Sequence, residues 1–461
     1  MDKTAGAKII QRLFDPKQIP ADAQKVLQDF DQIAQSALPA NSKQLVALPK
    51  QIRELSHKMT DERGERRLGY MNEKTFLASY VRYFMWWNLV RLTRLFSNLD
   101  FGFLRDGDVC LDIGSGPLTL PCALWLARPD LRQKKLVWYV MDISQLALSL
   151  GEEIFLSVAA ATGGEPWKIV RVKGPLGTPV KQKARFVSCA NMFNELLQSR
   201  GGEPPDFLAK KYSQALFKYL DFGTESERGA KNGGGGPAIF LAEPGVPKSA
   251  RFVSLMRDSF IRRGLLAVAP CPHQQSCPMD GRRAGQNGAN GKWCNFAFET
   301  DDAPRKLLAL SEKAGIPKER AVISFVFARQ QESVASPRSG GLLRVASDII
   351  RVPAAEPGQK SRIGHYACSE QGLVLALSSG GRRVYSGDLV EVENAGKPKN
   401  RAARESAASP RSGRRDYGLA DASGSRRNPS RDNNSRPPRN SSQSTAPSLR
   451  DAKTGALIVE I

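Results

Sequence analysis

The feature that most constrains the fold is an alternation of apolar strand-like segments with helical segments between Val109 and Arg329. Strands are predicted at Val109–Ile113, Leu136–Met141, Lys168–Val172, Ala184–Cys189, Ala238–Ala242, Leu265–Ala269 and Ala321–Ala328. Helices are predicted at Pro117–Ala127, Ser144–Ala161, Pro205–Tyr219 and Lys248–Arg263. Such alternation predicts an α/β fold, in which helices cover both faces of a mostly parallel sheet.

The alternation defines an α/β domain at 101–330, which carries a cysteine-rich insert at 269–296. The sequence on either side lacks this alternation and predicts separate regions. Residues 1–100 show helical spacing of apolar residues, and 331–394 predict a small β unit. The region 395–461 is rich in Arg, Ser and Pro and poor in apolar residues, which predicts a basic disordered tail. Only its end, Leu457–Ile461, is apolar enough for an ordered segment.

The charge balance is strongly basic, with 68 Lys and Arg against 46 Asp and Glu and a formal net charge of +22. A surplus of this size favours a polyanionic partner. Seven scattered cysteines and no secretory signal or clear mitochondrial presequence indicate a bacterial-type cytoplasm. Arg82, Arg91 and Arg94 interrupt Phe76–Phe96, the most apolar stretch, so we expect no membrane span. We expect its aromatic residues to pack in a core, with base stacking as the alternative.

A glycine turn follows the first predicted strand of the α/β domain. Gly114 and Gly116 let the backbone approach a ligand, and Asp142, at the end of the next strand, can accept hydrogen bonds from ribose hydroxyls. Asp112, Gly114 and Gly116 supply the Asp-x-Gly-x-Gly pattern that S-adenosylmethionine needs. Together with Asp142 they are the four predicted cofactor contacts.

Two alternatives to this cofactor remain. A dinucleotide site would require glycine where Thr119 stands. The turn could also be purely structural, with Asp142 capping the helix at Ser144. Leu118 occupies a position that is glycine in many methyltransferases, and we expect it to narrow the pocket.

Residues after the fourth strand should face the bound cofactor, because ligands bind at the carboxyl ends of parallel strands. Asn194 and Glu195 stand there and are the predicted catalytic residues near the methyl acceptor. The segment lacks the Asn/Asp-Pro-Pro-aromatic tetrad of amino-methylating enzymes. Cys189 is expected to be a buried strand residue.

The cysteine block is the most distinctive local pattern. Five residues separate Cys271 from Cys277, and sixteen more separate Cys277 from Cys294. A four-thiolate site needs one more ligand, and Cys368 is the candidate, because the other cysteines fall on apolar segments. The spacing leaves zinc, an iron–sulfur cluster and metal-free loop cysteines all open. His273 and His365 are expected to be outer-shell or surface residues rather than ligands.

Together these segments resemble the Rsm-type family of small-ribosomal-subunit methyltransferase-like proteins, which occurs in bacteria and mitochondria. The matching segments are Leu111–Pro117, Asn194–Leu196, Ala242–Gly245, Ala269–Pro278 and Trp293–Phe296. The resemblance implies a class I Rossmann-like methyltransferase fold, S-adenosylmethionine binding and association with the small ribosomal subunit and its rRNA. It also implies a [4Fe-4S] cluster on Cys271, Cys277, Cys294 and Cys368, with Zn as the alternative.

The sequence features and the resemblance lead to three alternative hypotheses for the function. The first is an S-adenosylmethionine-dependent RNA methyltransferase that acts in ribosome assembly and translation, as a monomer without membrane contact. The second is a non-catalytic RNA-binding assembly factor with a structural cluster. The third is a nicotinamide-dependent oxidoreductase, which Thr119 disfavours.

Overall fold

The computed structural model describes residues 7–60, 70–197, 202–223, 236–282, 290–331, 341–352, 361–378, 383–392, 450–451 and 453–461. Residues 1–395 and 450–461 form one unit, and the remaining segment, 396–449, lies outside the described residues. The predicted boundaries at 100, 330 and 394 stay predictions. None of the described helices is long and apolar enough to cross a membrane.

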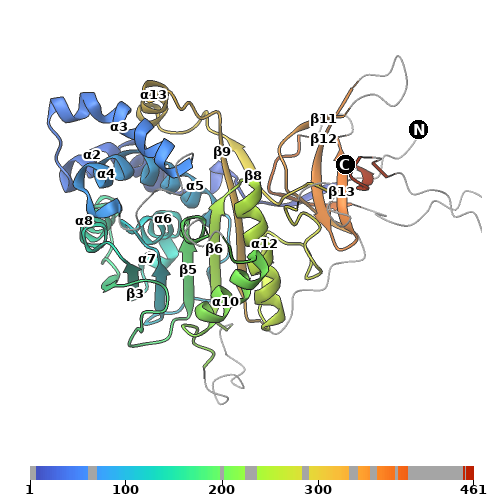
Figure 1. Ribbon diagram of the computed structural model, residues 1–461, viewed down its shortest axis with the longest axis horizontal. Helices are drawn as coiled ribbons and strands as arrows, with labels where there is room; N and C mark the ends of the chain where they lie inside the picture. The colour runs from blue at the N-terminus through green and yellow to red at the C-terminus, as the bar shows by residue number, and fades with distance from the viewer. Residues whose placement is uncertain are drawn as a thin grey trace, which may run out of the picture. The chain divides into compact units, whose positions relative to one another are not determined.

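The larger sheet has eight strands (Figure 1). They are β2 (Val109–Ile113), β3 (Val137–Asp142), β4 (Lys168–Lys173), β5 (Phe186–Ala190), β6 (Ala238–Pro244), β7 (Leu266–Ala269), β8 (Phe296–Glu299) and β9 (Arg320–Arg329). Their order is β4-β3-β2-β5-β6-β9-β7, with β8 also paired to β9. The first five run parallel, and β9 lies antiparallel between β6 and β7. This arrangement confirms the predicted class I Rossmann-like fold.

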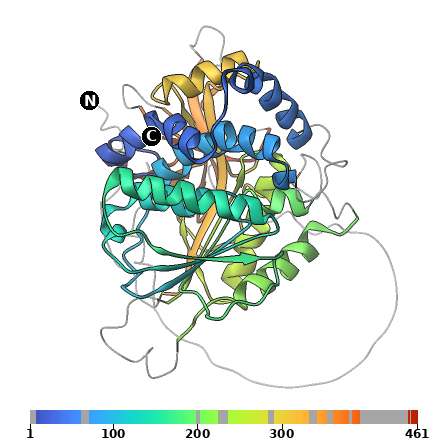
Figure 2. The ribbon, with the colours of Figure 1, turned by 90° about the vertical axis from the view of Figure 1, so that its left-hand side faces the viewer.

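Both faces of this sheet are buried because neighbouring strand residues point to opposite sides. Cys110 packs in the core that contains α6 (Thr119–Ala127) and α8 (Gln145–Thr162), whereas Leu111 packs in the core formed with α10 (Pro205–Phe217) and α12 (Pro247–Arg262). Cys110 and Cys189 are fully buried strand residues, which confirms the prediction made for Cys189. In Figure 2 the N-terminal helices lie beside α8.

The N-terminal region is mainly helical. Its helices are η1 (Pro16–Gln18), α1 (Ala21–Gln28), α2 (Phe30–Ala37), α3 (Ser42–Thr60), η2 (Tyr70–Asn72), α4 (Lys74–Ser79), η3 (Tyr80–Met85) and α5 (Trp86–Phe96). A proline inside a helical pattern predicts a break, and Pro49 does so within 43–59, but this prediction is wrong because α3 continues through Pro49. The segment η3 is a π-helix, a rare form that often occurs at functional sites. The aromatic residues Tyr83 and Trp87 are buried, which agrees with the predicted core packing.

Short helices complete the described chain. They are α7 (Pro129–Arg132), α9 (Phe193–Leu196) and α13 (Arg305–Lys313).

The second sheet joins both ends of the chain. Its strands are β1 (Lys8–Arg12), β10 (Gly341–Val345), β11 (Ile350–Val352), β12 (Arg362–Ser369), β13 (Gly372–Leu377), β14 (Asp388–Val392) and β15 (Leu457–Glu460). The Ser-Ser-Gly-Gly run at 378–381 predicts a hairpin between strands at Leu373–Leu377 and Arg383–Tyr385. The second strand of this prediction is wrong, because Arg383–Tyr385 are not in a strand. The hairpin instead connects β12 to β13 through a turn at Glu370 and Gln371. The end of the chain forms β15, so an ordered segment is present there as expected.

Candidate functional site

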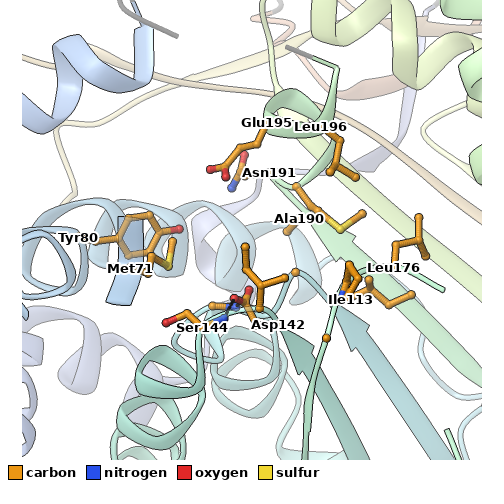
Figure 3. Close-up of a pocket in the computed structure, with 16 residues that line it drawn as sticks. Met71, Tyr80, Ile113, Asp142, Ser144, Leu176, Ala190, Asn191, Glu195 and Leu196 are labelled. Carbon is orange, nitrogen blue, oxygen red and sulfur yellow. Dashed lines mark hydrogen bonds between the residues drawn. The ribbon is translucent and has the colours of Figure 1, made fainter. Parts of the chain in front are cut away.

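A pocket lies at the carboxyl ends of β2, β3 and β5, where class I folds bind their ligands (Figure 3). Its lining residues come from the sheet loops and from the N-terminal region. They are Met71, Tyr80, Ile113, Gly114, Gly116, Asp142, Ile143, Ser144, Gly174, Pro175, Leu176, Ala190, Asn191, Met192, Glu195 and Leu196. Gly114, Gly116, Asp142 and Glu195 are therefore brought together as the sequence predicted.

The glycine turn is fixed by hydrogen bonds and by crowding. The amides of Gly114 and Ser115 both donate to the carbonyl of Met141, at 2.8 and 3.0 Å. Gly114 has a φ of 71°, and a Cβ there would lie 2.7 Å from Cγ of Met192. Only glycine fits this position, which keeps the backbone open toward the pocket.

Asp142 has two roles at once. Its Oδ2 accepts the Gly116 amide at 2.9 Å, and its Oδ1 accepts the Ser144 amide at 2.8 Å. Ser144 in turn caps α8 by accepting the Ala147 amide. The carboxylate thus holds the turn and the helix, yet each oxygen keeps a further lone pair for a ribose hydroxyl. Burial raises the pKa of Asp142, and the backbone hydrogen bonds oppose that rise.

Asp112 lies beneath the turn and does not line the pocket. It is 1% exposed, and its two oxygens accept the hydroxyls of Ser188 and Ser115 at 2.7 and 2.6 Å. Burial raises the pKa of Asp112 to about 7. The residue ties the turn to β5 and shapes the pocket from below, whereas the sequence predicted a cofactor contact.

Leu118 also behaves differently from the expectation that it narrows the pocket. It adopts a left-handed conformation, with φ 57° and ψ 36°, which is strained for an aliphatic residue. It is fully buried and is not a lining residue. Its side chain lies against Gly151 of α8, where a Cβ would approach Cδ1 of Leu118 to 2.6 Å. The missing side chain at Gly151 is what gives Leu118 its space.

The structure places the two predicted catalytic residues in different surroundings. Glu195 lines the pocket, but Asn194 points to α12, where its Oδ1 accepts the Ser249 hydroxyl at 3.4 Å. The carboxylate of buried Glu243 accepts the amides of Phe193 and Asn194 at 2.8 and 3.0 Å. Burial raises the pKa of Glu243 to about 8, and these two hydrogen bonds oppose the rise. Glu243 therefore anchors the start of α9 and positions Glu195, a role that the sequence did not indicate.

Most of the other lining residues were not predicted, and Met71, Tyr80 and Asn191 are the most informative of them. Met71 and Tyr80 come from the N-terminal helical region, about 40 and 30 residues before the glycine turn, so no local motif marks them. Asn191 has a φ of 58°, and such strained residues cluster at functional sites. In Figure 3 the side chains of Tyr80, Asn191 and Glu195 face the same space, opposite Asp142.

The four predicted cysteine ligands converge at the junction of the two sheets. Cys271 follows β7, Cys277 and Cys294 belong to the insert, and Cys368 lies on β12. Burial, and then the nearby thiols of Cys277, Cys368 and Cys271, raise the pKa of Cys294 well above its usual value. All seven cysteines are free of disulfides.

Two buried arginines accompany these thiols. Nε of Arg257 donates to Sγ of Cys271 at 3.0 Å, and Arg344 is 2% exposed. Burial lowers the pKa of Arg344 to about 10, against the opposite influence of Cys368 and Cys271. Such cations would compensate the negative charge of thiolates bound to a cluster. The donor set therefore fits a thiolate-held group in kind and charge.

No three His, Cys, Asp or Glu side chains in the described parts of the chain form a group that could hold a metal ion. The ligand set consequently stays a prediction. His273 is 7% exposed and neither ring nitrogen has a hydrogen-bond partner, and His365 is 2% exposed, so neither is a surface residue.

Comparison with protein families gives one match. The family model described as mitochondrial small ribosomal subunit Rsm22 matches residues 230–372. The resemblance to the Rsm-type family is confirmed. The matched segment contains Glu243 and all four predicted cysteine ligands, and it begins after the glycine turn at Gly114 and Gly116. Comparison with curated proteins returned no match.

Solved structures with a similar fold include methyltransferases. A SAM-dependent methyltransferase from Geobacter sulfurreducens, in complex with S-adenosyl-L-homocysteine, is 16% identical; the alignment covers 53% of this chain and 90% of that one, with a TM-score of 0.27. Magnesium protoporphyrin IX methyltransferase from Synechocystis PCC 6803, with bound SAH, is 10% identical over 67% of this chain and 100% of that one, with a TM-score of 0.31. The fold assignment itself rests on the strand order.

Proposed function

We propose that this protein is an S-adenosylmethionine-dependent methyltransferase that acts on small-subunit rRNA during ribosome assembly. The observation that carries the proposal is the pocket in which Gly114, Gly116 and Asp142 meet at the carboxyl ends of the parallel strands. A nicotinamide dinucleotide is the poorer fit, because Thr119 starts α6 where a third glycine would be needed.

Different residues of the pocket would contact different parts of the cofactor. Asp142 would accept the ribose hydroxyls, the glycine turn would admit the methionine part, and Ile143 and Leu176 offer apolar surface to the adenine. Bound S-adenosylmethionine supplies an electrophilic methyl group. Glu195 places a carboxylate in the same pocket, where it favours a cationic ligand and can orient the acceptor by hydrogen bonding.

The RNA partner is supported by charge and by family. The matched family is described by its link to the small ribosomal subunit, and the +22 net charge of this chain suits a polyanion. We further propose that the protein works as a monomer in a reducing, cytoplasmic compartment, where the seven free thiols would persist.

Cofactor binding can be tested directly by calorimetry. Asp142→Ala should abolish measurable S-adenosylmethionine binding, because it removes the ribose acceptor and loosens Gly116. Asp130→Ala is the matched control, since Asp130 is half exposed and forms an ion pair with Arg128 at the far end of α6. Transfer of labelled methyl to small-subunit RNA or assembly intermediates is the functional readout. Binding without transfer to any of them would refute the catalytic proposal.

A [4Fe-4S] cluster on Cys271, Cys277, Cys294 and Cys368 is the second part of the proposal. The proposal is supported by the mutual influence of these thiols, by the Arg257 guanidinium that donates to Cys271, and by the family resemblance, which favours the cluster over zinc. Protein purified without oxygen should be brown, with visible iron–thiolate absorption that Cys294→Ser reduces. Colourless protein containing stoichiometric zinc would overturn this part.

One observation favours the second candidate, a non-catalytic assembly factor. The family match covers the cysteine block and begins after the glycine turn, so the match itself gives no support to the cofactor pocket. A Gly116→Ala/Asp142→Ala double variant that loses cofactor but still restores ribosome assembly in a deletion strain would favour this candidate. Loss of assembly together with cofactor binding would favour the enzyme.

A further inference from the structure

Two cationic side chains, Arg91 and Lys318, lie close enough for Arg91 to influence Lys318, and Arg91 also influences Tyr80 of the cofactor pocket. Arg91 lies on α5, where Nη1 donates to the carbonyl of Val322 at 3.0 Å and Nη2 donates to Oδ1 of Asn88 at 2.7 Å. Lys318 precedes β9, and its ammonium lies 5.7 Å from the ring centre of Trp87. Within the described chain, neither cation has an ion pair with a carboxylate.

The arrangement is costly without an anion. Burial and then the charge of Arg91 lower the pKa of Lys318 to about 8, and burial lowers the pKa of Arg91 to about 10. Two partly buried like charges repel, and each has lost part of its hydration. A bound anion would remove both penalties, and uncompensated cations of this kind are typical of binding sites.

Electrostatics connects Arg91 to the pocket, because the Arg91 charge is close enough to lower the pKa of the Tyr80 hydroxyl against the larger effect of burial. Asn88, whose Oδ1 accepts from Arg91, lies on the same helix. Tyr80 lines the pocket, and in Figure 3 its hydroxyl points into it. Val322, which anchors Arg91, packs against Gly245 at the carboxyl end of β6. The cations therefore lie at the same edge of the sheet as the pocket.

The free donors indicate the ligand. A guanidinium has five N–H donors, of which Arg91 uses two, and the Lys318 ammonium has three, none of which bonds to any residue that the structure describes. An oxyanion with several acceptor oxygens, such as a phosphate group, matches this set. Both side chains are partly accessible, so a phosphate can enter from solvent.

We propose that Arg91 and Lys318 bind a backbone phosphate of the RNA strand whose base is presented to the cofactor pocket. This inference rests on the proposed function, since it assumes that the pocket serves an RNA substrate. Contact with the phosphate would fix the strand relative to Tyr80 and Glu195 without reading its sequence.

Binding of a labelled 12-nucleotide single-stranded RNA, measured by fluorescence anisotropy at several salt concentrations, tests the site. Lys318→Met keeps the apolar stem and should weaken binding several-fold for every sequence, with the salt slope smaller by about 0.7. Lys313→Met, at the exposed end of α13, is the matched control and should change neither quantity. Equal effects of both variants, or none from Lys318→Met, would overturn the proposal.

A second measurement follows the reactivity of Lys318 in the native protein, so its result does not depend on whether a variant folds. With a lowered pKa, Lys318 should be acylated faster than exposed lysines at pH 7.5, and the RNA should protect it in a mass-spectrometric footprint. Inorganic phosphate at the same phosphate concentration should protect it much less. Protection by inorganic phosphate alone would assign the site to a small ligand and contradict the RNA proposal.

Cofactor calorimetry separates this inference from the proposed function. Lys318→Met should bind S-adenosylmethionine as the native protein does, because Lys318 does not line the pocket. A native protein that binds RNA through Lys318 but takes no cofactor would refute only the methyltransferase. A native protein that methylates RNA while Lys318→Met binds it unchanged would refute only the phosphate site.

Discussion

Asp112 shows how a single buried carboxyl can serve a ligand pocket without touching the ligand. The Ser115 and Ser188 hydroxyls satisfy its two oxygens, so it fixes the turn from beneath. Hydroxyls can donate or accept, and the neutral amide of asparagine could replace the carboxyl by reversing one of these bonds. Replacing Asp112 by asparagine should therefore change the pH dependence of the free energy of unfolding more than it changes the packing of the turn.

Asp112→Asn should flatten the pH dependence of stability. The folded pKa of Asp112, about 7, lies above its usual value of 3.8, so the folded state retains a proton that the unfolded chain releases. The native protein loses this stabilisation as the pH rises from 4 to 7. The variant does not, because the asparagine amide carries no titratable proton. The variant should gain on the native protein by roughly 1 kcal/mol per pH unit in that window, measured by denaturant unfolding. Parallel curves would show that Asp112 ionises normally in the folded protein.

Gly151→Ala tests the space that Leu118 occupies. Alanine inside an exposed helix would stabilise it by up to about 1 kcal/mol, but here the new Cβ would lie 2.5 Å from the backbone of Pro117. We expect a net loss of about 1–3 kcal/mol and weaker S-adenosylmethionine binding, because the turn must move. Gly202→Ala, at an open surface position, is the control. A stabilised Gly151→Ala protein would contradict the packing of Leu118 described above.

At the scale of elements, the α/β core could be predicted because its signals are local. The strand Val109–Ile113 has the predicted bounds, and the other strands of the parallel core differ by one or two residues at their ends, since apolar runs bounded by turns mark them. β1 could not be predicted, because its partner β14 lies more than 370 residues away and neither sequence specifies the other. The same reason hides Tyr80 from any motif search, whereas Asp142 and Glu195 follow strands that were recognised.

Removing β15 should weaken the small sheet. β15 pairs in parallel with β13, and the adjoining Ala456 and Ile461 are 0% and 3% exposed. Ending the chain at residue 449 should therefore cost on the order of 3 kcal/mol, seen as a lower melting temperature. It should also leave β13 as an open edge that promotes association, visible in light scattering. Lys453→Ala, which removes only a surface side chain, should change neither; an unaltered melting temperature after truncation would mean that β15 adds no stability.

At the scale of the whole molecule, two sets of positive charges could contact RNA: the Arg91–Lys318 pair and the basic segment 396–449. Residues 396–449 carry twelve Lys or Arg and four Asp or Glu, and they connect two strands of the same sheet. A segment of this composition offers many phosphate contacts that do not depend on sequence. Lys318 and Arg91, by contrast, offer the one phosphate contact proposed above.

Replacing 396–449 by a Gly-Ser linker of the same length should separate these two contributions. Overall affinity for single-stranded RNA should fall strongly at low salt, and the salt slope should fall by several times the 0.7 expected for Lys318→Met. The melting temperature should stay the same, because β15 is retained and keeps its place beside β13. Protection of Lys318 by RNA should persist in this variant at higher RNA concentration. If protection disappears at every concentration, the basic segment delivers the strand to the pocket; if affinity is unchanged at low salt, RNA is held by the folded part of the chain.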